Sequence, residues 1–160
     1  MKISTKGRYG LEALVDLALH ASEGPVSINK IAARLSLSET YILQIFLKLR
    51  RAGIINSTRG VNGGYTLALP PESINVLMVL TALEGQLTPV DCILPESKLP
   101  CDRIENCTTR PLWEDMYNLL SEIAENITIH ALMNCAKELA RKNAESQPLE
   151  QKNELIEYFL

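Results

Sequence analysis

The feature that most constrains the fold is a glycine-rich turn between two short segments of alternating apolar and polar residues. The turn has the sequence Gly60-Val61-Asn62-Gly63-Gly64. Residues 54–59 precede it and residues 65–69 come after it, and both read as strands. An Asn-Gly step between two strands is a strong hairpin signal, because both residues tolerate the positive backbone angles of a tight turn. The sequence therefore predicts a two-stranded hairpin over residues 54–69.

Three helices are predicted before this hairpin. Apolar residues at helical spacing predict the first over residues 5–21, and the Gly24-Pro25 pair separates it from the second helix. Ser27 and Ser38 stand at the N-cap positions of the second and third helices, since a serine side chain accepts a hydrogen bond from the free amides of a helix start. A tight connection over residues 36–38 joins these two helices, and Gly53 ends the third.

The third helix carries a stripe of hydrogen-bonding and cationic side chains opposite its apolar face. The stripe is formed by Tyr41, Gln44, Lys48 and Arg51, with Thr40 beside it. A helix that only faces solvent usually mixes in acids, and here Glu39 in the first turn is the one acid. Residues 28–51 therefore fit a helix-turn-helix whose second helix enters a DNA groove. An ordinary amphipathic helix pair in a bundle is the alternative.

The predicted hairpin favours the DNA-binding interpretation, because a hairpin directly after a recognition helix forms a wing. Arg59 stands at the approach to the tip, where an arginine is long enough to enter a narrow minor groove. Gly60 and the glycines after it let the backbone approach the sugar-phosphate edge closely. We therefore predict a mainly α, winged helix-turn-helix protein with a two-stranded wing and a long C-terminal dimerisation helix.

Charge is distributed unevenly along the chain. The formal net charge is −3, yet the first 68 residues hold nine basic and four acidic side chains, and the remainder holds seven and fifteen. A basic N-terminal part followed by an acidic remainder is expected when one part of a protein contacts phosphate. Chance segregation of the charges is the alternative.

The C-terminal half is predicted to be helical around a segment that contains three of the four cysteines. A fourth helix is expected from a Ser73 cap to Gly85, and a long helix over residues 111–126. Thr128 caps a last helix that reaches about residue 143. The long helix has more apolar surface than the N-terminal half of the chain can cover, so we expect a homodimer. Two recognition helices would then lie about 34 Å apart on a palindromic operator.

The chain divides by these criteria into four parts. Residues 1–84 form the DNA-binding unit, residues 85–109 the cysteine segment, residues 110–143 the dimerisation helices and residues 144–160 a tail. The tail is polar and then apolar over residues 155–160, so its end is expected to dock on protein surface.

The cellular setting and the class of protein can be inferred from what the sequence lacks. It contains no run long and apolar enough to span a membrane, and Glu12 and Asp16 interrupt the apolar run after the basic start, so that start is not a signal peptide. We therefore expect a cytoplasmic protein, in which cysteines favour metal or redox chemistry over disulfides. The sequence contains no nucleophile–base pair, phosphate loop or paired carboxylates, which argues against an enzyme.

Three motifs resemble the IscR, NsrR and CymR regulators over residues 1–134. They are the opening over residues 1–10, the wing over residues 59–65 and the Asn126-Ile127-Thr128 step. The resemblance implies a homodimeric winged-helix repressor or activator. Its DNA-reading positions are matched here by Ser38, Thr40, Tyr41, Gln44 and Arg59, and Lys6 would contact phosphate. Gln44 can bond two edges of adenine. Leu43 replaces the IscR glutamate that discriminates between types of DNA site, so such switching is not expected.

In the IscR and NsrR branches the resemblance also implies an iron–sulfur cluster, of the 2Fe-2S type here. Cys92, Cys101 and Cys107 match its three thiolate ligands, with a first gap longer than that of IscR. Thiolates are the usual ligands of such clusters, and the spacing is neither a ferredoxin nor a zinc-finger pattern. Three unrelated cysteines in a loop are the alternative.

The fourth ligand is not given by the resemblance. Arg110 stands where IscR has a histidine, and Arg8 stands where NsrR has an acid. The candidates are a small exogenous thiol and the side chains of Glu12 or Asp16 from a partner, Asp102, Glu105 and Cys135. Cys135 fits a buried core thiol better than a ligand, and His130 fits a structural role.

Two functions are compatible with these residues. The first is a regulator that senses an iron–sulfur cluster, in cluster assembly or in the response to redox or nitric oxide stress. The alternative is a CymR-like regulator of sulfur or cysteine metabolism, controlled by a protein partner at the C-terminal tail. In the alternative the cysteine segment is structural or a thiol-redox element.

Overall fold

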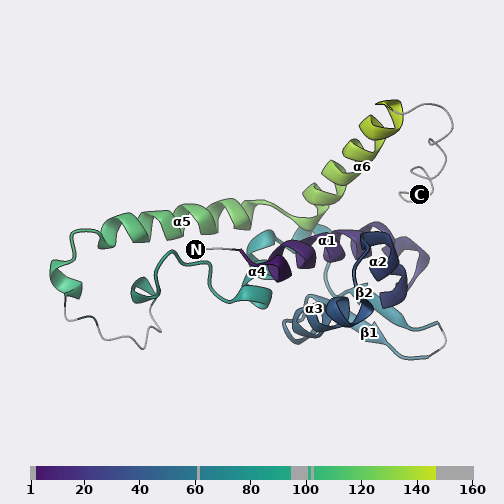
Figure 1. The fold of residues 1–160 in the computed structure, drawn as a ribbon, viewed down its shortest axis with the longest axis horizontal. Coiled ribbons are helices and arrows are strands. Elements are labelled where there is room, and N and C mark those ends of the chain that lie inside the picture. Colours follow the sequence, from purple (N-terminus) through teal and green to yellow (C-terminus); the bar gives the residue numbers. More distant parts are fainter. Residues whose placement is uncertain (1–2, 61, 95–100, 102, 147–160) are drawn as a thin grey trace.

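The computed structural model describes residues 3–60, 62–94, 101 and 103–146, and it is helical apart from one hairpin (Figure 1). The elements in chain order are α1 (Thr5–Leu19), α2 (Ile28–Leu35), α3 (Glu39–Arg51), β1 (Ile55–Thr58), β2 (Gly64–Leu67), α4 (Val76–Glu84), α5 (Arg110–Asn126) and α6 (Ile129–Ser146). Short 3-10 turns lie at Ala21–Glu23, Pro71–Ser73, Asp91–Ile93 and Ile104–Asn106. The predicted fold class is confirmed. We call residues 3–84 the head.

Serine side chains begin two of the head's helices. The Ser4 hydroxyl accepts a hydrogen bond from the Lys6 amide at the start of α1, and the Ser38 hydroxyl accepts one from the Tyr41 amide at the start of α3. Between α2 and α3 the backbone of Ser36 turns left-handed, with φ at 53°. The Leu37 amide then donates to the Ala32 carbonyl over 2.9 Å. These local bonds end α2 and set α3 at an angle to it, as a helix-turn-helix requires.

The predicted hairpin is present, with slightly shorter strands than the sequence suggested. β1 and β2 pair antiparallel, with Ile55 opposite Leu67 and Thr58 opposite Gly64. Gly60 has φ at 117°, a conformation that glycine adopts without a steric penalty. A bridge between Val26 and Tyr65 fastens the hairpin to the segment before α2. The wing is thus anchored at its base, and its strands point away from α3 (Figure 1).

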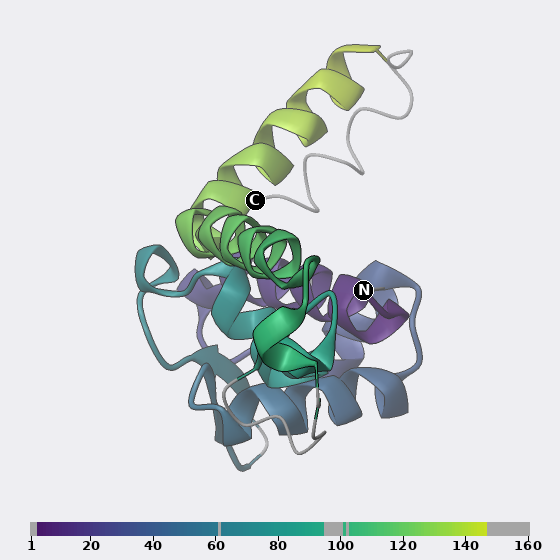
Figure 2. The same cartoon turned by 90° about the vertical axis from the view of Figure 1, so that its left-hand side faces the viewer.

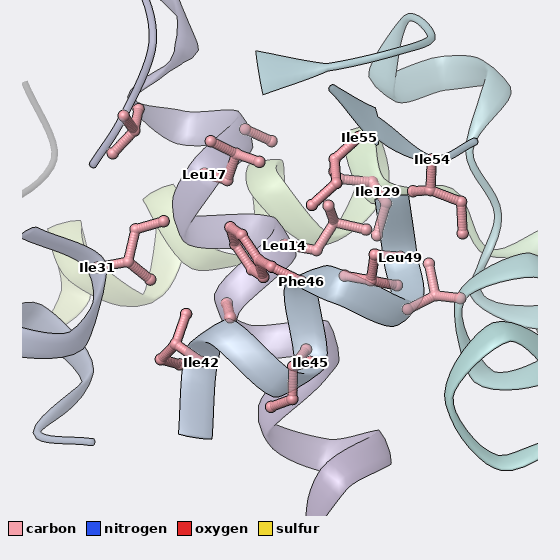
Figure 3. Close-up of a cluster of buried hydrophobic side chains, with 14 of the residues drawn as sticks. Leu14, Leu17, Ile31, Ile42, Ile45, Phe46, Leu49, Ile54, Ile55 and Ile129 are labelled. Atoms are coloured by element: carbon pink, nitrogen blue, oxygen red, sulfur yellow. The ribbon is translucent and has the colours of Figure 1, made fainter. Parts of the chain in front are cut away.

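One apolar core holds the head together, and the first residue of α6 belongs to it. Fully buried side chains from α1, α2, α3 and the wing meet there, as Figure 3 shows for Leu14, Leu17, Ile31, Ile42, Ile45, Phe46, Leu49, Ile54, Ile55 and Ile129. The ring of Phe46 meets Tyr65 edge to face, with 5.0 Å between centroids. α1 also approaches α4 closely, because a Cβ on Gly10 would lie 2.1 Å from Leu83 Cδ1.

The start of α4 differs from the prediction. Ser73 lies in the 3-10 turn after Pro70, and Asn75 caps α4 instead, its side chain accepting a bond from the Met78 amide over 2.9 Å. Ile74 fills a core position between them, so the helix starts after it. The Ile74 carbonyl accepts from the Ile129 amide and the Val76 amide donates to Ile127, each over 2.8 Å. α4 and α6 are therefore joined through their first turns.

α5 leaves the head, and residues 103–109 lie at its far end (Figure 1). α6 projects from the head in another direction, which Figure 2 shows from the side. The Thr128 hydroxyl accepts from the Ala131 amide, which confirms this cap, and α6 continues to Ser146, beyond the predicted end. None of the helices within residues 3–146 that the structure describes is long and apolar enough to cross a membrane. The expected docking of the tail concerns residues 147–160, which lie outside the described residues.

Candidate nucleic-acid interface and cysteine segment

The open face of α3 carries some of the side chains predicted to read DNA. Thr40, Gln44 and Arg51 are exposed, as is the capping residue Ser38. The opposite face is fixed in the core by Ile42, Ile45, Phe46 and Leu49, all fully buried. The head thus holds α3 rigidly and leaves one face of it free, which is the arrangement of a recognition helix.

Two members of the predicted stripe point toward the head instead. Tyr41 packs edge to face on Tyr9, with 6.1 Å between centroids, and its hydroxyl is buried without a hydrogen-bond partner among the described residues. Lys48 is half-buried, and its Nζ donates to the Leu83 carbonyl over 2.7 Å. Both residues flank the buried face of α3, where α1 and α4 lie within reach. The structure therefore separates them from Gln44 and Arg51.

Leu43, which the resemblance matched to a DNA-reading glutamate, lies in the open face as well. Its side chain is 40% exposed, between the exposed Thr40 and Gln44. A helical wheel places it there too. The side of α3 opposite the buried Ile42, Ile45 and Leu49 contains positions 40, 43, 44, 47 and 51. The predicted stripe, which begins at Tyr41, follows one edge of this open face and therefore includes the half-buried Tyr41 and Lys48.

The wing lies beside α3 and presents the predicted arginine. Arg59 and Gly60 are exposed at the end of β1. Arg50 of α3 donates from Nη1 to the Ser57 hydroxyl over 3.1 Å, which joins the recognition helix to the wing. Lys6, in the first turn of α1, is half-buried. The structure thus brings the wing and α3 together on one side of the head, as Figure 1 shows.

Asp16 is committed to an ion pair inside the head. Its side chain is buried, and it accepts from Arg34 Nε over 2.7 Å and from Arg34 Nη2 over 2.6 Å. The His20 Nδ1 lies 3.7 Å from the same carboxylate. This two-bond pair joins α1 to α2 and leaves Asp16 unsuited to bind a metal from a partner chain. Glu12, one turn earlier, is exposed.

Arg110 ties the cysteine segment to the start of α5. Its Nη1 donates to the Cys92 carbonyl and its amide donates to the Cys107 carbonyl, each over 3.3 Å. Its Nε pairs with Glu114 over 2.7 Å. The residue that stands where IscR has a histidine therefore connects two of the three cysteines through their backbones.

The cysteines differ in exposure and in chemistry. All four are free thiols, with Cys92 and Cys107 half-buried and Cys101 exposed. A hydrogen bond from the Thr109 side chain, with Sγ 3.5 Å from Oγ1, lowers the pKa of the Cys107 thiol, and the charge of Arg103 adds to the effect. Cys135 is exposed on α6, so the expectation of a buried thiol was wrong.

The donor set fits an iron–sulfur cluster in kind. Free thiols are the ligands such a cluster needs, and a lowered pKa favours the thiolate that binds iron. Among the residues that the structure describes, no three of the His, Cys, Asp and Glu side chains lie close enough to hold a metal ion together. Cys92, Cys101 and Cys107 would therefore have to draw together to bind one. Asp102, a candidate fourth ligand, lies outside the described residues, and Glu105 is exposed.

The chain is similar to bacterial transcription regulators. It is 40% identical to the regulator IscR of Aliivibrio salmonicida over 133 residues, which are 83% of this chain and 77% of the relative. It is 39% identical to a putative HTH-type regulator of Haemophilus influenzae, over 84% of this chain and 87% of that protein.

Two solved structures resemble the fold. CymR, the global cysteine regulator of B. subtilis, matches with a TM-score of 0.67 and 36% identity, over 84% of this chain and 97% of that one. IscR of T. potens matches with a TM-score of 0.68 and 38% identity, over 87% and 90%. The Rrf2 model, described as an iron-dependent transcriptional regulator, covers residues 3–135. The chain therefore belongs to the Rrf2 family of transcriptional regulators, and it is not an enzyme.

Proposed function

We propose that this regulator is a homodimer that binds a palindromic operator and senses an iron–sulfur cluster through Cys92, Cys101 and Cys107. The observation that carries the proposal is the set of three free thiols, two of which belong to residues whose carbonyls accept hydrogen bonds from Arg110 of α5. The iron-dependent description of its family and its similarity to IscR support this ligand set. The regulator would act in the cytoplasm, on genes for cluster assembly or for redox or nitric oxide stress.

A second copy of the chain is the proposed cover for α5. The helix exposes a stripe of large apolar side chains formed by Leu112, Met116, Leu119, Ile123 and Ile127. Leu119 and Ile123 are each 59% exposed, and a stripe of this length on a free helix indicates a protein contact. Pairing two copies of α5 would cover both stripes and give the two-fold symmetry of a palindromic site.

Within the head, α3 and the wing are the proposed DNA contacts. Ser38, Thr40, Gln44 and Arg51 would face the major groove, and Arg59 with Gly60 would meet the minor groove. Lys6 would bind phosphate. We assign Tyr41 and Lys48 to positioning α3, because one packs on Tyr9 and the other bonds Leu83.

When bound, a 2Fe-2S cluster would supply one-electron redox chemistry and sensitivity to nitric oxide. The protein's own part would be to hold the thiols at the end of α5. Arg110 bonds the backbones of Cys92 and Cys107, and Thr109 lowers the pKa of the Cys107 thiol. A change at the cysteine segment would thereby move α5. Through the dimer, this movement would change the distance between the two heads.

Anaerobic purification tests the cluster. The wild type should contain iron and sulfide in equal amounts and absorb visible light that bleaches in air. The triple variant C92S/C101S/C107S should contain neither. Cys135→Ser, at an exposed thiol that is a candidate fourth ligand, shows whether that thiol also binds the cluster. A wild type that is colourless and free of iron, with DNA binding unaffected by the triple variant, would rule the proposal out.

The alternative is a CymR-like regulator of sulfur or cysteine metabolism with a protein partner at residues 144–160. The observations that favour it are the match to CymR and the lack of a converged metal site among the described residues. It predicts iron-free protein after anaerobic purification. It also predicts that deleting residues 153–160 abolishes regulation in cells and leaves DNA binding intact.

A further inference from the structure

An open groove with an apolar lining lies between α1, α2 and α6. Its volume is about 540 Å³. The aliphatic side chains that line it are all half-buried, and they are Leu11, Val15, Leu19, Leu35, Leu132 and Ala136. Most of them also pack against the core of the head, so one side of each is covered and the other faces the groove. An apolar groove of this size indicates a site that a ligand or a protein segment covers.

The apolar surface continues from this groove along α6. Leu132, Ala136 and Leu139 are three or four residues apart, so they share one face of the helix. α6 projects from the head (Figure 2), and Leu139 on it is 55% exposed. This face leads from the groove toward Ser146, the last residue of α6. A segment that returns along α6 from its end would therefore cover both the leucine and the groove.

The sequence that follows α6 matches the groove in polarity and charge. Residues 155–160 read Leu-Ile-Glu-Tyr-Phe-Leu, with five large apolar or aromatic side chains and one acid, Glu157. The cation that lines the groove is Arg8, which is exposed and lies with its guanidinium carbon 5.3 Å from the ring centre of Tyr9. Arg8 forms no ion pair with a carboxylate among the residues that the structure describes. The groove thus offers apolar surface and a positive charge to a segment that carries apolar side chains and a negative one.

The tether is long enough for this segment to reach the groove of its own chain. Along α6, Ala136 lies about 15 Å from Ser146, at a rise of about 1.5 Å per residue. Residues 147–154 can span up to about 26 Å when extended. A segment held on so short a tether has an effective concentration of about 1 mM at its site, so even weak docking is favoured. A second copy of the chain lacks this advantage.

We propose that residues 155–160 dock in the groove between α1, α2 and α6 of their own chain. Their apolar side chains cover the lining of the groove, and Glu157 pairs with Arg8. The docked segment fastens α6 to the head at a second place, beyond Ile129. This inference goes beyond the proposed function, because it requires neither bound DNA nor a bound cluster.

Photo-cross-linking of the full-length protein tests the contact. Phe159 is replaced by the photoreactive analogue p-benzoylphenylalanine, and the irradiated protein is digested and analysed by mass spectrometry. The cross-links should fall in residues 11–19 of α1 and residues 132–136 of α6. An equal mixture of unlabelled and nitrogen-15-labelled chains, equilibrated so that dimers exchange, identifies the chain that supplies the groove. Both peptides of each cross-linked pair should carry the same label.

Two variants and a control assign the cross-links to the groove. Ala136→Arg introduces a charge into the groove and should lower the yield about tenfold, because docking would then bury an unpaired cation. Ile156→Asp places the charge on the tail instead and should give the same loss without altering the head. Lys137→Arg, at the exposed neighbouring position on α6, is the matched control and should keep the yield.

Three results would overturn the proposal. The first is an absence of cross-links to the groove, and the second is a yield that survives Ile156→Asp. The third is a set of mixed-label pairs, which would give the groove to the tail of a second copy. The analogue placed at Leu112 instead should not cross-link to residues 11–19, since such a product would make α5 of a second copy the occupant. None of these readings depends on DNA affinity or iron content, so their failure would leave the proposed function standing.

Discussion

The Nζ of Lys48, on the recognition helix, donates a hydrogen bond to the carbonyl of Leu83 over 2.7 Å. Leu83 lies in the last turn of α4, where carbonyl groups lack partners and the helix dipole favours a cation. The next residue, Glu84, accepts from the Gly7 amide over 2.7 Å and from the Ser4 hydroxyl. The end of α4 therefore holds α3 and the start of α1, directly before the chain enters the cysteine segment.

Lys48→Met tests whether this lysine positions α3 or contacts phosphate. Methionine keeps much of the apolar stem and removes the charge, so the free energy of unfolding should fall by about 1 kcal/mol. The slope of log affinity against log salt should not change, because no phosphate contact is lost. Urea unfolding and DNA titrations at several salt concentrations measure the two effects. A slope smaller by about one, at unchanged stability, would make Lys48 a phosphate contact.

Arg59→Ala tests the wing. The side chain is exposed, so stability should stay unchanged while DNA affinity falls by about 1–3 kcal/mol. Fluorescence anisotropy on a selected site gives the affinity. Arg59→Lys keeps the charge and should recover part of the loss. If the alanine variant binds like the wild type at every salt concentration, the wing does not contact DNA at this residue.

Asp16→Asn tests the buried ion pair with Arg34. Asparagine has nearly the same shape and removes the charge that Arg34 needs, so the free energy of unfolding should fall by about 3 kcal/mol. Glu12→Gln is the control, since Glu12 is exposed on the same helix. Urea unfolding should be measured on iron-free protein, in which a metal ligand has no effect on stability. A loss confined to the iron-loaded protein would make Asp16 a ligand instead.

The lowered pKa of Cys107 predicts its reactivity. A thiol with a lowered pKa is more fully ionised at neutral pH, so Cys107 should react with iodoacetamide faster than the exposed Cys101 and Cys135. Its rate should level off at a pH below the ordinary pKa of a cysteine thiol. Thr109→Val removes the side-chain hydrogen bond and should move that pH upward. Peptide mapping by mass spectrometry tracks each thiol of the reduced, iron-free protein, and equal rates for all three would contradict the prediction.

Ile123→Glu tests the dimer. A carboxylate in the centre of the α5 stripe should prevent pairing, so the protein should sediment as a monomer and bind a palindromic site much more weakly. Ile123 is 59% exposed, so the head should unfold as in the wild type. Glu122→Gln, at an exposed polar position on the same helix, is the control. An unchanged dimer would place the interface elsewhere.

Local signals predicted the elements of the head, and they failed where distant contacts decide. The Ser38 cap of α3 and the glycine-rich turn of the wing act within a few residues, so the sequence identifies them. Ser27 stands at the start of α2 as predicted, but its side chain makes no capping hydrogen bond, and the Ser4 cap of α1 was not predicted. The cap of α4 was missed because Ile74 is drawn into the core and α6 bonds its carbonyl. No local pattern contains that information.

The candidate site could likewise be predicted from the sequence only where neighbouring residues decide its structure. A helical period shows that α3 has a polar face, and the burial of four apolar residues fixes its centre. Whether Tyr41 and Lys48 belong to that face depends on Tyr9 and Leu83, which lie far away in the sequence. The exposure of Cys135 likewise results from the way α6 projects from the head.

The burial of Ile129 in the head has a consequence for how the protein is made. A ribosome releases the chain from its N-terminus, and the core around Phe46 stays open until residue 129 has emerged. By then the cysteine segment and α5 have already been synthesised. Translation that stops before residue 129 therefore yields a head whose apolar core lacks this side chain.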